Sequence, residues 1–249
     1  MELYIDNNLD QKYDAIIDDY VYKGLIKIVT NIEHDISINL VDPKYIITTH
    51  DGIDVPMENR ASCSIQHKDG NFEIFINNNK LDLIKEVLAN ELGGLAANHK
   101  IKSWNPDYLD GNQLAIVFSC LRSYLSAKIT RNVSIQDTIV FVNEITFKDC
   151  PFERIMNGID TEPLKSIILN MLCVMPALQL RIENHFYSNL ILFEKLCESQ
   201  NIVDNVLVRI QYESTTDLSK EDVLTMIDKC NEICTLIEEF KGGVRLENV

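Results

Sequence analysis

The chain has 249 residues, of which 46% are hydrophobic and 24% charged, and its formal net charge is −15. This length allows one large domain or two small ones with a substantial core. So acidic a chain argues against direct binding of nucleic acid or of anionic membranes, because both attract basic surfaces. The charge is compatible with a basic protein partner, and also with acidity that only keeps the protein soluble.

The N-terminal residues 1–14 are acidic and lack the apolar core of a secretory signal. The longest apolar stretch, 167–180, is too short to span a membrane. The seven cysteines include no CxxC pair, so reduced thiols are the simplest interpretation. Together these features predict a cytoplasmic protein without a membrane anchor or a cofactor.

The first part of the chain is predicted to combine helices with a small antiparallel sheet. Three segments come first: a helical rhythm at 12–32, extended pieces at 36–49 and a loop at 50–60. The segment 62–77 predicts a β-hairpin, because Asp69-Gly70 is a turn signal between two β-rich runs. Helices are then expected at 81–99 and 111–130, on either side of a loop that contains Pro106.

The second part of the chain is predicted to be mainly helical. Its expected features are a mixed region at 131–160 with an apolar run at 138–147, helical sequence beyond Pro163 with a break near Pro176, and a helix at 187–213. A last helix is expected to begin after Ser219 as N-cap and to end at Gly242-Gly243. Its apolar stripe at 223–240 could be the seam of a homodimer or could pack on the core of its own chain.

These elements predict a mainly helical α+β fold. An α+β part at 1–130 would carry the hairpin and the central helices, and a mainly helical part at 131–249 would pack with it as one unit. The sequence contains no GxSxG, Walker A or GxGxxG motif, so nothing indicates a hydrolase nucleophile of that type or a nucleotide-binding loop.

The stretch 90–99, NELGGLAANH, lies on the first central helix, after a strand and before a second helix. In this order of elements the chain resembles the gluzincin-type zinc metallopeptidases, including bacterial and phage-related families, whose helix carries HExxH. The resemblance covers residues 62–125 and implies that Glu91 stands where the general base would be. It also implies that Asn90, Gly94 and Asn112 stand where zinc ligands would be. None of these three side chains can bind zinc as a histidine or a carboxylate would.

An alternative interpretation of the same helix involves no peptidase ancestry. Glu91 could be a buried carboxylate with a hydrogen-bonding partner, and Gly93-Gly94 could allow another helix to approach closely. His99 matches the family pattern, but it lies on the opposite side of the helix from Asn90.

Two further groups of residues are candidates for a site. The histidines are scattered in sequence, but His50, His67 and His99 could meet in space if the hairpin packs on the central helix. Trp104 and Tyr108 lie on the loop between the central helices. They could contact a protein partner, or they could form a local hydrophobic cap over the helices.

The leading hypothesis is a non-enzymatic binding or regulatory protein, on a metallopeptidase-like scaffold that has lost its zinc site. One alternative is an atypical metal-dependent hydrolase that uses Glu91 and His99. The other is an acidic inhibitor or immunity-type protein that occupies the basic surface of a partner.

Overall fold

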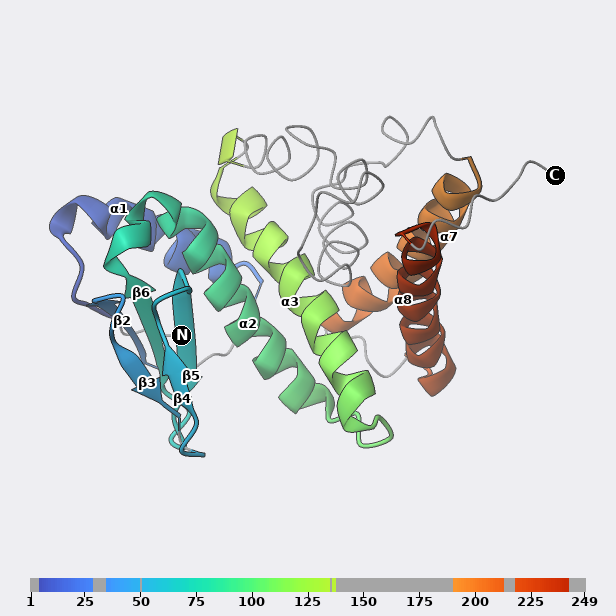
Figure 1. Ribbon diagram of the computed structural model, residues 1–249, viewed down its shortest axis with the longest axis horizontal. Coiled ribbons are helices and arrows are strands. Elements are labelled where there is room, and N and C mark those ends of the chain that lie inside the picture. The colour runs from blue at the N-terminus through green and yellow to red at the C-terminus, as the bar shows by residue number, and fades with distance from the viewer. Residues whose placement is uncertain are drawn as a thin grey trace.

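A sheet lies at one end of the protein, and long helices stand beside it in succession (Figure 1). The computed structural model describes residues 5–28, 35–49, 51–134, 136–137, 190–212 and 218–241. This arrangement confirms the mainly helical α+β fold expected from the sequence. None of the helices in these ranges has the length and apolar character that crossing a membrane requires.

The main sheet has four strands in the order β1-β2-β6-β5, which are β1 (Ile5–Asn7), β2 (Ile36–Val41), β6 (Phe72–Asn77) and β5 (Ser62–Gln66). The predicted hairpin is confirmed, since β5 and β6 pair antiparallel with Ser62 opposite Ile76. The expectation of a wholly antiparallel sheet is wrong, because β1, β2 and β6 are parallel. A helical connection follows β1, and three strands separate β2 from β6, so both connections can return the chain in the same direction.

A second, two-stranded sheet consists of β3 (Ile46–Thr48) and β4 (Asp54–Pro56), which pair antiparallel. The expectation of a loop at 50–60 is therefore wrong in its central part. The turn is closed at Gly52, whose N–H donates to the carbonyl of Thr49 at 2.9 Å and whose φ is +73°. This conformation suits glycine, because a side chain strains the backbone there.

The predicted N-terminal helix is shorter and less regular than its sequence rhythm indicates. A 3-10 turn, η1 (Gln11–Tyr13), leads into α1 (Asp14–Ile17) and then into a π-helical segment, η2 (Asp18–Leu25). Gly24 is buried against α3, and a Cβ there would lie 2.8 Å from Cγ2 of Ile129. The glycine that interrupts the apolar rhythm thus permits close packing.

The two central helices form the middle of the molecule. A 3-10 turn, η3 (Asn78–Leu83), precedes α2 (Ile84–Trp104), and α3 (Gly111–Val133) follows the connecting loop. α2 extends beyond its predicted end to Trp104. Asn105 follows it with a left-handed φ of 50° and stands before a proline, and both features stop helices. α3 starts with a capping box between Asp110 and Gln113.

α2 is buried along most of its circumference, because the sheet and α3 cover different sides of it (Figure 1). α3 comes close to α2 at Gly93, where a Cβ would overlap Oγ of Ser126 and lie 2.8 Å from the carbonyl oxygen of Arg122. A Cβ at Gly94 would reach no atom closer than 3.4 Å. Gly93 therefore sets the distance between the two helices, as the second interpretation of this pair expected.

The C-terminal part contributes α7 (Leu190–Gln211) and α8 (Lys220–Lys241). Ser219 caps α8 as predicted, since its Oγ accepts the N–H of Asp222 at 3.0 Å. The apolar stripe of α8 is buried within the chain at Val223, Met226, Ile227, Cys230 and Ile233, which is the second of the two roles expected for it. The apolar run 138–147, the break near Pro176 and Gly242-Gly243 lie outside the described residues.

The two neighbouring glycines of α2 should respond oppositely to alanine. Gly93→Ala should lower the free energy of unfolding by about 1–3 kcal/mol, because the added methyl meets the backbone of α3. Gly94→Ala should be neutral or raise it by up to about 1 kcal/mol through helix propensity. Chemical denaturation of the two variants measures both values, and equal effects would contradict the close approach at Gly93.

Asp222 should make the protein sensitive to acid at the start of α8. The hydrogen bonds from Ser219, and then the nearby Arg209, hold the pKa of Asp222 below its ordinary value of 3.8. Stability from this carboxylate is therefore present above pH 3.8 and is lost as the pH falls further. Thermal unfolding as a function of pH should show a shallower acid loss for Asp222→Asn than for Asp228→Asn, an exposed control on the same helix.

Candidate functional site

Glu91 is a buried carboxylate whose two oxygens both accept hydrogen bonds from strand β5. Its exposed fraction is 4%. Oγ of Ser62 donates to Oε1 and Oγ of Ser64 donates to Oε2, each at 2.6 Å. The two serines reach the same carboxylate because alternate residues of a strand share a face, and this face of β5 is turned toward α2.

The guanidinium of Arg122, on α3, completes this group. Its Nη2 lies 3.5 Å from Oε1 of Glu91. Its Nε donates to Oδ1 of Asn90 at 3.1 Å and to the carbonyl oxygen of Asn90 at 3.3 Å. We call these five residues the Glu91 cluster: Ser62, Ser64, Asn90, Glu91 and Arg122.

Gly94 lies beside Arg122, and a Cβ there would stand 3.4 Å from its Nε. Asn90 and Gly94, the positions that the peptidase resemblance assigns to zinc ligands, therefore both border a guanidinium. A permanent cation occupies this side of α2, and it pairs with Glu91 and Asn90. In the Glu91 cluster, charge is balanced by protein groups alone.

The cluster connects three elements of the fold, since its members come from β5, α2 and α3. A general base must reach the proton that it abstracts. Among the described residues, the donors that contact the carboxylate oxygens of Glu91 are Ser62, Ser64 and Arg122, which hold it in place. The arrangement is suited to fixing β5 and α3 against α2.

Asn112 and His99 lie away from the cluster. Asn112 is exposed in the first turn of α3, ten residues before Arg122, which is about 15 Å along the helix axis. His99 follows Glu91 by eight residues on α2, about 12 Å along the axis. His99 lines a pocket of about 190 Å³ with Gln66, Lys68, Asp69, Gly70, Leu95 and Lys102.

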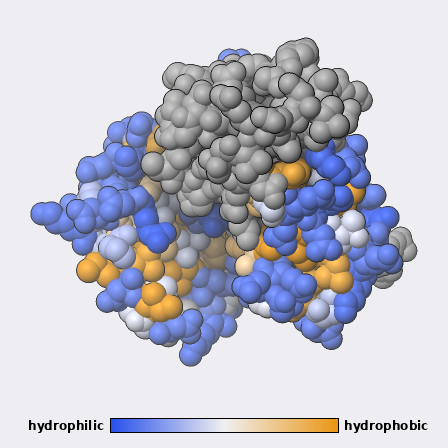
Figure 2. Space-filling view, turned by 45° about the vertical axis from the view of Figure 1, so that its right-hand side comes forward, coloured by the Kyte–Doolittle hydropathy of each residue, from blue (hydrophilic) through white to orange (hydrophobic). Residues whose placement is uncertain are grey.

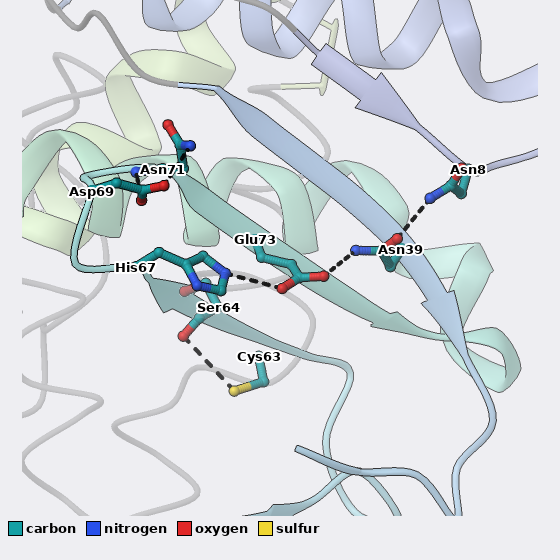
Figure 3. Close-up of polar contacts among 8 residues, drawn as sticks. All are labelled: Asn8, Asn39, Cys63, Ser64, His67, Asp69, Asn71 and Glu73. Atoms are coloured by element: carbon teal, nitrogen blue, oxygen red, sulfur yellow. Dashed lines mark hydrogen bonds and ion pairs between the residues drawn. The ribbon is translucent and has the colours of Figure 1, made fainter. Parts of the chain in front are cut away.

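His67 belongs to a polar chain on the outer face of the sheet (Figure 3). Its Nε2 lies 3.1 Å from Oε2 of Glu73, whose Oε1 accepts from Nδ2 of Asn39 at 2.8 Å. Oδ1 of Asn39 in turn accepts from Nδ2 of Asn8 at 2.7 Å. These side-chain contacts run across all four strands of the main sheet and link each strand to the next.

Of the three histidines expected to meet, the structure describes His67 and His99. The ring of His67 contacts Glu73 on the outer face of the sheet, whereas His99 lies on α2, which covers the inner face. His34, His50 and His185 lie outside the described residues. Within the described ranges, no three His, Cys, Asp or Glu side chains come together in a way that could hold a metal ion.

Trp104 and Tyr108 contact each other edge to face, with ring centroids 6.3 Å apart and planes at 76°. Trp104 is half-buried against the main core, and Nζ of Lys220 lies 5.6 Å from the ring centroid of Tyr108. Burial raises the pKa of the Tyr108 hydroxyl, and among the described residues this hydroxyl has no hydrogen-bond partner. The pair therefore closes the end of α2 and α3 beside the start of α8, and its role in binding a partner stays a prediction.

Sequence reasoning identified Glu91 but missed the residues that hold it. The serines at 62 and 64 show the two-residue spacing of one strand face, and that face precedes the helix bearing Glu91, so their meeting could have been inferred. Nothing in the sequence indicates which helical turn of α3 stands opposite Asn90. Arg122 is placed there by the packing at Gly93.

Comparison of the chain with models of protein families, with curated proteins and with solved structures gives no match.

Removing the carboxylate of Glu91 should destabilise the fold. Glu91→Ala leaves the hydroxyls of Ser62 and Ser64 without their acceptor and removes the ion pair of Arg122, and should cost about 2–4 kcal/mol of unfolding free energy. Glu91→Gln should cost less, because a hydroxyl can turn to accept from the new amide. Denaturant unfolding gives these values. Glu86→Ala, at an exposed position of the same helix, serves as control and should stay within about 0.5 kcal/mol of the parent protein.

Proposed function

We propose that this chain is a non-enzymatic binding or regulatory protein, with a scaffold similar to that of a metallopeptidase and without its zinc chemistry. The observation that carries the proposal is the state of Glu91, whose two oxygens are both occupied by serines while Arg122 stands beside it. The residue that would act as base in a peptidase here links β5 and α3 to α2 through its hydrogen bonds and ion pair.

The alternative of a hydrolase that uses Glu91 and His99 receives less support from the geometry. These two residues are separated by about 12 Å along one helix, and their surroundings differ. Glu91 is buried among donors, whereas His99 borders the pocket next to Lys68 and Lys102. The alternative of an acidic protein that occupies a basic partner is consistent with the net charge of −15 and is compatible with the leading proposal.

Zinc binding and hydrolysis test the proposal directly. We expect calorimetric titration with zinc to show no stoichiometric tight site, because neither Asn90 nor Gly94 supplies a good ligand. We also expect no zinc-dependent cleavage of unstructured protein substrates above the level of Glu91→Gln. Ser62→Ala is the matched control, since it loosens the same carboxylate without removing it.

Stoichiometric zinc together with hydrolysis that disappears in Glu91→Gln and persists in Ser62→Ala would overturn the proposal. All measurements are made below the unfolding temperature of the least stable variant, so that loss of fold is not mistaken for loss of chemistry.

A further inference from the structure

The β3–β4 ribbon exposes more apolar surface than its small size requires. Tyr45, Ile46 and Ile53 are 47%, 56% and 61% exposed, and all lie within or next to this ribbon. Figure 2 shows apolar residues open to solvent, with hydrophilic residues around them, on the lobe that carries the sheet. Exposed aromatic and aliphatic side chains gathered on one element are typical of surfaces that bind a partner.

The ribbon is held firmly on the outer face of the main sheet. Ile47 and Met57 are buried with Phe75 of β6 in a small second core. The ring of Tyr45 stacks on Phe75 with centroids 6.1 Å apart. Nδ2 of Asn77 donates to the carbonyls of Met57 and Arg60, each at 2.9 Å. The exposed side chains are therefore displayed on a fixed support, which lowers the entropy lost on binding.

The two edges of the ribbon differ. The carbonyl of Tyr45 accepts from the N–H of Met57, and the carbonyl of Ile53 accepts from the N–H of Thr49. Because bonded and non-bonded pairs alternate in an antiparallel ladder, Ile46 and Thr48 direct their N–H and C=O groups outward from β3.

The outward positions of β4 are Asp54 and Pro56. Proline has no N–H, so it prevents regular pairing at that edge. The edge of β3 carries no such block, and in the described part of the chain no other strand pairs with it.

The charge around the ribbon is mainly negative. Residues 42–60 contain four carboxylates against two basic side chains; the carboxylates are Asp42, Asp51, Asp54 and Glu58. All four are at exposed positions. An apolar centre with an acidic border matches a segment in which apolar and basic residues alternate.

We propose that the β3 edge of the ribbon binds an extended, basic segment of a partner protein, which adds to β3 as a further strand. Backbone groups of Ile46 and Thr48 would pair with the segment. Apolar side chains of the segment would contact Ile46, and basic ones would face the carboxylates of the border. This inference rests on the proposed binding function and names the surface and the chemistry of the partner.

The probe is an acetylated and amidated heptapeptide in which lysine and valine alternate, and the matched peptide has glutamate in place of lysine. Calorimetry should show binding of the lysine peptide, at least about tenfold weaker binding of the glutamate peptide, and weakening with salt. Hydrogen exchange should slow at the amides of Ile46 and Thr48 when the lysine peptide is present. Absence of binding, or protection elsewhere only, would overturn the inference.

Thr48→Pro blocks the edge without removing a ladder bond, since the N–H of Thr48 points outward. It should weaken the lysine peptide by about tenfold. Ile46→Lys provides a second variant if the proline impairs folding, and Leu83→Lys is the control at an exposed apolar residue away from the ribbon. If Leu83→Lys weakened binding of the lysine peptide as much as Ile46→Lys does, the assignment of the binding site to the β3 edge would be refuted.

Analytical sedimentation of the concentrated protein tests whether a second copy of the chain binds the β3 edge instead. A dimer that Thr48→Pro abolishes would mean that the edge serves a second copy of the chain, and this result would also overturn the proposal. The zinc and hydrolysis measurements do not involve the ribbon, so failure here is distinguishable from failure of the non-enzymatic function.

Discussion

The close approach of α2 and α3 at Gly93 is the constraint on which the centre of the molecule depends. With no Cβ between the helices, the backbone of α3 comes near enough for Arg122 to reach Asn90 and the carboxylate of Glu91. The same carboxylate is held from the other side by Ser62 and Ser64. A steric condition at one residue thus positions an electrostatic contact that links the sheet to the second helix.

A buried carboxylate is costly unless it is hydrogen-bonded and its charge is balanced. The Glu91 cluster meets both conditions with protein groups alone. It therefore differs in kind from a peptidase centre, which must keep a metal-bound water and an open position. Whether the scaffold descends from such an enzyme stays a hypothesis. The present arrangement gives Glu91 a structural role in linking β5, α2 and α3.

The sequence predicted what depends on local pattern. The hairpin at Asp69-Gly70, the capped start of α8 and the succession of long helices follow from turn signals, caps and apolar periodicity. The parallel pairing of β1, β2 and β6, the β4 strand and the position of Arg122 were missed, since each depends on contacts between distant segments. For the candidate site, the sequence identified Glu91 and suggested the close helix approach that occurs at Gly93, but the position of Arg122 emerged only from the packing.

The unlike edges of the β3–β4 ribbon limit how far any assembly through it can grow. A filament requires each ribbon to pair on two sides, whereas Pro56 leaves β4 without the donor that regular pairing needs. Pairing between copies of the ribbon through β3 would therefore stop at two copies. A surface that carries exposed Tyr45, Ile46 and Ile53 can then engage one strand at a time without serving as a template for indefinite aggregation.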